Sequence, residues 1–196
     1  MFNINFADVK TIKTYSVSDL ISNQINLKNK TSEIFRAKAI LEGYQKVGCN
    51  AINVGHYEVL NGLSFLKSMA EETSIPFISS NLRDPKSGEL IFSPYMVFQR
   101  GNLKIGVVGS SDLIPDTTTA ILVDDFVESC NRYAEELDGK VDIVVALVNA
   151  SRTSQTGLPE KMPNVDLIIT SGNTCLLYTS DAADEGLGVD LGGRRI

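Results

Sequence analysis

The chain contains two apolar runs that lack the polar alternation of a surface strand. Residues 141–148 read VDIVVALV, and residues 103–109 read LKIGVVG. Short runs that are apolar on both faces are typical of strands in the middle of a sheet that other elements cover on both sides. We therefore predict a layered fold in which these two runs form the centre of a sheet.

Helical segments alternate with such runs along the chain. Apolar residues recur at helical spacing in residues 32–47, 63–73 and 126–137. The first segment begins at Ser32, a suitable N-cap, and the third follows Asp124 or Asp125, which are suitable for the same reason. Three amphipathic helices are therefore expected.

Shorter apolar runs complete the pattern of strands. They lie at residues 51–54, 75–78, 95–100 and 165–170. Gly101-Asn102 separates residues 95–100 from residues 103–109, and this pair suits a tight hairpin turn. Helices that alternate with strands, together with one hairpin, predict an α/β fold with a mixed sheet. We find no internal repeat and no linker between domains.

Composition excludes several classes of protein. The 196 residues carry a formal charge of -6 without a basic stripe, which argues against a nucleic-acid partner. No apolar run approaches the roughly 20 residues of a membrane span. One histidine and three widely spaced cysteines do not supply a zinc cluster or a disulfide framework. Any metal chemistry has to depend on carboxylates or on residues that this chain does not contain.

The end of the chain does not have the pattern of a protein segment. The codons that fit CLLYTSDAADE resemble a transposon-end adapter used in short-read library preparation, and those that fit VDLGGRRI resemble the adjoining flow-cell adapter. The alternative is a natural glycine-rich acidic tail. We predict that residues 175–196 are adapter-derived and that the native reading frame was cut at about Thr174, so a longer read of the same locus should not encode LYTSDAADE.

Five blocks between Phe35 and Asn173 resemble, in the same order, the metallophosphoesterase domain of the 5′-nucleotidase family. They are GCNAINVGHYEVLNGLSFLK, IPFISSNL, FSPYMVFQRGNLKIGVVGSS, VDIVVALVNAS and VDLIITSGN. The resemblance implies an α/β fold with the mixed-sheet sandwich of the metallophosphoesterase type, here incomplete. We therefore expect a poorly patterned N-terminal segment at residues 1–30, a partial phosphoesterase-like domain at residues 31–174 and the adapter-derived tail.

The same resemblance implies a centre of two divalent metals, but most of the ligands are replaced. The family's N-terminal Asp-x-His motif has no counterpart in the chain. In its Asn-His-Glu block the Asn position is His56, the His position is Tyr57, and Glu58 is retained. Asn149 stands where a downstream strand of the family ends in His, and the last motif reads Ser171-Gly172-Asn173, also without His.

The metal candidates are therefore His56, Glu58 and Asn149. A two-metal centre needs about seven or eight metal–ligand bonds, which these three residues do not provide. We expect that the two metals are not retained and that the protein is inactive as a phosphoesterase. One hypothesis is a binding or regulatory paralogue, and the other is a metal-dependent nucleotide phosphohydrolase whose remaining ligands lie outside this chain.

The resemblance also suggests a nucleotide or another phosphate ester as ligand, and an exported or periplasmic parent protein. Asn81, at the family's Asn position, either lines the cleft or only forms a turn. Residues 151–156 are expected as an exposed loop.

A third hypothesis for the function is a redox module that uses Cys49 as a reactive thiol. The alternative is that Cys49 is a small apolar side chain buried in the core. The sequence does not indicate an oligomeric state. If the chain is cut after the strand at residues 165–170, the apolar edges of the sheet are left unpaired, and we expect the chain to be poorly soluble.

Overall fold

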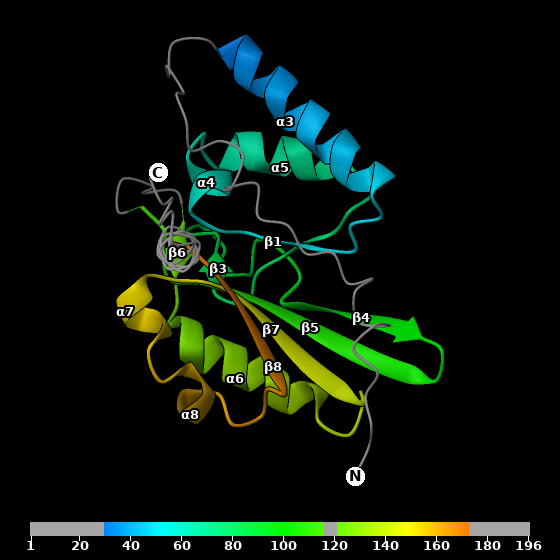
Figure 1. The fold of residues 1–196 in the computed structure, drawn as a ribbon. Coiled ribbons are helices and arrows are strands. Elements are labelled where there is room, and N and C mark those ends of the chain that lie inside the picture. The colour runs from blue at the N-terminus through cyan, green and yellow to red at the C-terminus, as the bar shows by residue number, and fades with distance from the viewer. Residues whose placement is uncertain (1–29, 116–120, 173–196) are drawn as a thin grey trace, which may run out of the picture.

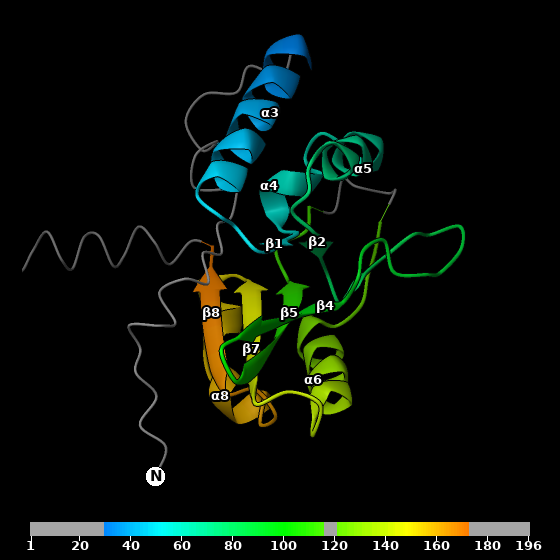
Figure 2. The ribbon, with the colours of Figure 1, turned by 90° about the vertical axis from the view of Figure 1, so that its right-hand side faces the viewer.

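The computed structural model describes residues 30–115 and 121–172, which form four layers (Figures 1 and 2). Helices α3 (Lys30–Lys46) and α5 (Leu63–Glu72) lie on one side, above a small sheet. A four-stranded sheet follows, and helix α6 (Phe126–Leu137) covers its far face. The α/β fold with a mixed sheet is confirmed.

The larger sheet contains the two apolar runs from which its existence was predicted. Its order is β4 (Tyr95–Arg100), β5 (Leu103–Ser111), β7 (Ile143–Asn149) and β8 (Leu167–Ser171). Strand β4 is antiparallel to β5, whereas β5, β7 and β8 are mutually parallel. Gly101, in the turn between β4 and β5, has a φ of 58°, which L side chains rarely adopt.

Two small sheets join the segments between the helices. Strands β1 (Ile52–Asn53) and β2 (Phe77–Ile78) pair in parallel, and β3 (Leu82–Arg83) pairs antiparallel with β6 (Leu122–Val123). We did not predict the β3–β6 pair. Short helices α4 (His56–Val59), α7 (Arg152–Gln155) and α8 (Leu158–Lys161) complete the described part.

Residues 151–156 were expected as a loop, and that expectation was wrong. Ser151 is the N-cap of α7, and its hydroxyl accepts a hydrogen bond from the Ser154 N–H at 3.1 Å. Serine favours this position because its side chain satisfies a backbone donor that the helix leaves without a partner. The expected cap of α6 is confirmed as Asp125, whose carboxylate accepts from Val127 N–H and Glu128 N–H.

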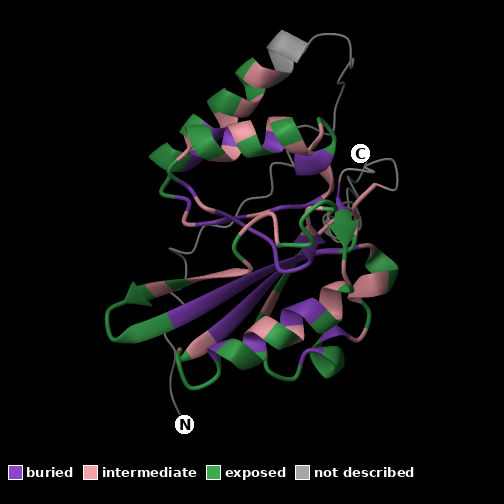
Figure 3. Cartoon of the chain, turned by 180° about the vertical axis from the view of Figure 1, so that it is seen from behind, coloured by how far each residue is buried: buried purple, intermediate pink, exposed green. Residues whose placement is uncertain are grey.

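Three apolar clusters hold the layers together. One joins α3 and α5 to the helix-facing side of β1 and β2, one lies between the two sheets, and one joins α6 and α8 to the larger sheet. The middle of the larger sheet is buried on both faces, whereas exposed residues lie on the outer sides of the helices, at the β4–β5 hairpin and on the edge strands (Figure 3). Each fully buried Val, Leu or Ile side chain stabilises the fold by about 1.5–3 kcal/mol.

The predicted segments at the two ends of the chain lie largely or wholly outside the described residues. They are residues 1–30, of which only Lys30 is described, and the tail at residues 175–196. Among the described residues, no helix has the length and apolar character needed to cross a membrane. In the same part of the chain, β4 and β8 are the outer strands of the larger sheet.

The two sheets come closest at Gly109 in β5. A Cβ at this position would lie 2.6 Å from Asn53 Oδ1 and 2.8 Å from Ile78 Cγ1. Backbone hydrogen bonds from Ser80 N–H to Gly109 O (2.7 Å) and from Gly109 N–H to Pro94 O (3.2 Å) fix the contact. Only glycine leaves enough space for β1 and β2 to pack this closely on β5.

We therefore expect Gly109→Ala to destabilise the protein. The added methyl group overpacks the space between the sheets, which costs about 1–3 kcal/mol in the free energy of unfolding. Urea unfolding followed by circular dichroism measures the change. Gly43→Ala is the matched control, because nothing lies within 4 Å of the added Cβ in α3. This control should stabilise the helix by up to about 1 kcal/mol, and a Gly109→Ala variant as stable as the control would contradict the close approach.

Candidate functional site

Polar side chains gather where the strands of both sheets end. The buried polar residues Ser79, Ser80, Asn81, Ser110, Ser111 and Asn149 all follow or close an apolar strand. Asn53 at the end of β1 donates from Nδ2 to Ser110 O at 3.0 Å, which joins the two sheets here. In α/β folds, ligands bind outside the carboxyl ends of the strands, so this edge is the candidate site.

Asn149 is the centre of the hydrogen bonds at this edge. Its Oδ1 accepts from the His56 backbone N–H (3.2 Å) and from the Ser111 hydroxyl (3.3 Å). Its Nδ2 donates to Ser171 Oγ at 3.0 Å, and the side chain is 3% exposed. The amide of Asn149 therefore joins the ends of β5 and β8 to the first residue of α4. The sequence indicated its position but not this role.

Glu58, the residue retained from the family's motif, stabilises the start of α4. Its Oε2 accepts the Gly55 N–H at 2.9 Å, and the side chain is buried. Gly55 is needed at this point because a Cβ there would lie 2.8 Å from Asn149 Cγ. The Glu58 carboxylate is thus part of a helix cap beneath Asn149.

His56 is half-buried at the first position of α4. Its Nδ1 lies 3.1 Å from Leu113 O. A carbonyl oxygen only accepts, so Nδ1–H is the donor of this bond, and in the neutral ring that leaves Nε2 with the free lone pair. The ring also contacts Tyr57 edge to face, with the centroids 4.8 Å apart. His56 is the candidate side chain whose Nε2 remains suited to accept a proton or to bind a metal.

Asn81 connects three segments of backbone. Its Nδ2 donates to Ser111 O (2.7 Å) and Asp124 O (3.1 Å), and its Oδ1 accepts the Ser111 N–H at 3.0 Å. Asn81 is fully buried, so these contacts account for its presence without a ligand. The assignment of Asn81 to substrate binding stays a prediction.

Asp112 and Ser154 form a second polar group next to Asn149, and the sequence did not reveal that these two residues pair. Ser154 Oγ in α7 donates to Asp112 Oδ2 at 2.5 Å and lies 2.8 Å from Ser151 Oγ. The Asp112 N–H donates to Asn149 O at 2.8 Å, which places the carboxylate next to the centre of the site. The signal available in the sequence was the polar stretch directly after each apolar run.

The described residues do not fit the two-metal centre that the resemblance implies. In residues 30–115 and 121–172, no three side chains of the His, Cys, Asp and Glu types group closely enough to hold a metal ion. Asn149 is hydrogen-bonded through both of its amide atoms, and Glu58 caps α4. The assignment of His56, Glu58 and Asn149 as metal ligands stays a prediction.

The two described cysteines are buried. Cys49 Sγ–H donates to Ala51 O at 3.3 Å, and Cys130 lies in the core under α6. Desolvation by burial raises the pKa of the Cys130 thiol to about 12. A thiol at this pKa is protonated at neutral pH and is a poor nucleophile.

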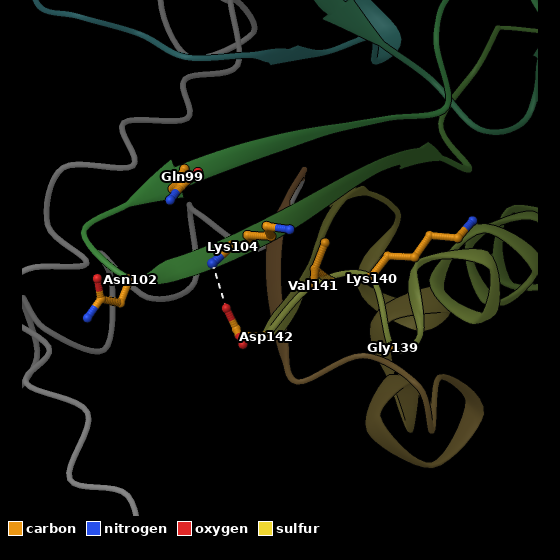
Figure 4. A pocket seen from close by; sticks show the side chains of 7 residues that line it. All are labelled: Gln99, Asn102, Lys104, Gly139, Lys140, Val141 and Asp142. Atoms are coloured by element: carbon orange, nitrogen blue, oxygen red, sulfur yellow. Dashed lines mark hydrogen bonds between the residues drawn. The ribbon is translucent and has the colours of Figure 1, made fainter.

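A shallow cavity of about 300 Å³ lies at the opposite end of the larger sheet (Figure 4). Lys104 N–H donates to Asp142 Oδ2 at 2.7 Å, and Asp142 N–H donates back to Lys104 O at 2.8 Å. The lining residues are Gln99, Asn102, Lys104, Gly139, Lys140, Val141 and Asp142. This cavity lies where β5 and β7 begin, so it is separate from the candidate site.

Curated proteins similar to the chain include 5′-nucleotidases and UshA proteins. A 5′-nucleotidase of Vibrio parahaemolyticus is 32% identical over 94 residues, which are 48% of this chain and 17% of the relative. Protein UshA of Escherichia coli is 32% identical over 106 residues, which are 54% of this chain and 19% of the relative. The chain thus spans less than a fifth of the length of these relatives. No protein-family model matches it.

Solved structures with the same fold are phosphoesterases and related hydrolases. The calcineurin-like phosphoesterase YfkN of Bacillus subtilis has a TM-score of 0.59 at 21% identity, over 72% of this chain and 51% of the other. A 5′-nucleotidase precursor of Thermus thermophilus has a TM-score of 0.60 at 19% identity, over 70% and 28%. The chain therefore has the calcineurin-like phosphoesterase fold, and about half of it is homologous to 5′-nucleotidases.

Proposed function

We propose that this chain is a 5′-nucleotidase-like phosphoesterase domain that binds a nucleotide or another phosphate ester but does not hydrolyse it with two metals. The protein then acts as a binding or regulatory paralogue of the enzymes. The observation that carries this proposal is the Asn149 amide, which is buried and bonded through both of its polar atoms.

An amide in this position is a poor substitute for an imidazole. Divalent transition metals such as zinc prefer imidazole nitrogen to an amide group. Turning the Asn149 oxygen toward a metal would remove the acceptor from the His56 N–H, whereas the Ser111 hydroxyl still has the Asn149 backbone carbonyl as an acceptor. Each buried polar group left without a partner costs about 1–3 kcal/mol, so the fold itself opposes metal binding through Asn149.

The small number of charged side chains buried at the strand ends supports the same proposal. Two-metal hydrolysis uses a cluster of carboxylates and imidazoles to hold the cations that polarise the phosphate. At the described strand ends, the buried side chains are hydroxyls and amides, with Glu58 used as a helix cap. The ligand class rests on the relatives, which are named as 5′-nucleotidases and therefore favour a nucleotide or a similar phosphate ester.

A second candidate function is favoured by the geometry of His56. The Leu113 carbonyl holds Nδ1 at 3.1 Å, which leaves Nε2 as the ligand atom, and a backbone carbonyl often holds a metal-binding histidine in this way. The protein would then be a metal-dependent nucleotide phosphohydrolase with an altered set of ligands. The other ligands would lie outside this chain, so metal content is measured on the full-length protein.

Metal content and AMP hydrolysis distinguish the two functions. We expect elemental analysis of the purified full-length protein, after incubation with Mn²⁺ or Zn²⁺ and desalting, to give less than one metal per chain. AMP hydrolysis should not exceed the background rate, and His56→Ala should change neither value. Two metals per chain with turnover, both lost in His56→Ala, would instead establish the phosphohydrolase.

The structural role of Asn149 is tested separately. We expect Asn149→Ala to lower the free energy of unfolding by at least about 2 kcal/mol, because the His56 N–H and the Ser171 hydroxyl lose a buried partner. Urea unfolding measures the loss. Asn61→Ala is the control, because Asn61 is exposed, and its effect should stay within about 0.5 kcal/mol. Equal stability of the two variants would mean that Asn149 does not hold the strand ends together.

A further inference from the structure

Strand β8 is an outer strand of the larger sheet (Figure 2). It carries partly exposed apolar side chains. Leu167 and Ile169 are 37% and 38% exposed, whereas their neighbours in register, Val145 and Leu147 of β7, are 2% and 4% exposed. Val145 and Leu147 belong to the cluster between the two sheets. The exposed pair on β8 therefore continues the inter-sheet core beyond the part that β1 and β2 cover.

The backbone of β8 has an open side. Ala150 N–H donates to Ser171 O at 3.1 Å, and in the parallel register of the two strands this turns the backbone groups of Leu167, Ile169 and Ser171 toward β7. The N–H and C=O of Ile168 and Thr170 consequently point away from β7. Among the described residues, no strand pairs with this side of β8.

We infer that β8 is a self-association site at which a second copy of the chain adds its own β8 antiparallel. A two-fold axis at Ile168 places Leu167 of each copy opposite Ile169 of the other. Ile168, whose backbone groups point outward, then lies opposite Ile168 of the other copy and exchanges both hydrogen bonds with it, while Leu167 and Ile169 form the neighbouring non-hydrogen-bonded pairs, in which side chains lie closer together. The two larger sheets then become one continuous sheet, and the apolar pairs meet on one face.

The charge distribution favours a second copy as the occupant. Leu167–Ser171 reads LIITS, without charge, proline or glycine, and lacks the devices by which edge strands avoid pairing with one another. Asp166, the residue before the strand, is exposed, and its Oδ2 accepts the Val144 N–H of β7 at 2.8 Å. The opposite edge strand, β4, ends in a charged residue, Arg100, and charged residues on an edge disfavour pairing with another strand.

Sedimentation of the full chain over a concentration series tests this site. We expect a reversible monomer–dimer equilibrium, and Ile169→Lys should weaken the dimer at least about tenfold because it places a charge in the paired strip. Val97→Lys is the matched control, because Val97 is 45% exposed on the other edge strand. The control should leave the dimer unchanged.

Amide hydrogen exchange of the unmodified chain provides a second measurement that does not depend on how well the variants fold. The amides of Ile168 and Thr170 should become protected as the concentration rises. A chain that stays monomeric would overturn the proposal, and so would equal weakening by both lysine variants. Protection of the same two amides in the dilute monomer would also overturn it, because another segment of the same chain would then cover β8.

Discussion

The structure depends on how closely the two sheets approach each other at Gly109. Asn53 and Ile78 pack directly over this residue, and Ser80 and Pro94 hydrogen-bond to its backbone. The strands of both sheets therefore end in one place, where their polar last residues meet. A side chain at residue 109 would separate the layers and, with them, the groups of the candidate site. The candidate site is thus a consequence of close packing in the core beneath it.

Elements with a strong apolar pattern were predictable from the sequence. The runs that form β5 and β7, the hairpin at Gly101 and the helix capped by Asp125 all rest on local patterns of side chains, and the structure confirms each of them. Strands β3 and β6 were missed because each has two residues, and both residues of β6 are exposed, so no alternation marks it. Their pairing is determined by contacts between segments that are far apart in the sequence.

The candidate site, too, was predictable only in part. The sequence identified His56, Glu58 and Asn149 as positions of interest through a resemblance, and these residues lie at one edge of the fold. It did not reveal that the Asn149 amide bonds to three elements or that Asp112 and Ser154 pair beside it. Hydrogen bonds between residues separated by many positions leave no periodic pattern in a chain, so they become visible only after folding.

Under the proposed function, Asn149 explains how such a site could lose its metals without losing its fold. An imidazole that binds a metal ties neighbouring strands together through the cation, and its replacement by an apolar residue would leave polar strand ends without partners. An asparagine supplies one acceptor oxygen and one donor nitrogen, which match the N–H of His56 and the hydroxyls of Ser111 and Ser171. The amide then stabilises the junction directly. Because the same atoms cannot serve both the junction and a metal, stability gained in this way opposes the return of metal chemistry through that residue.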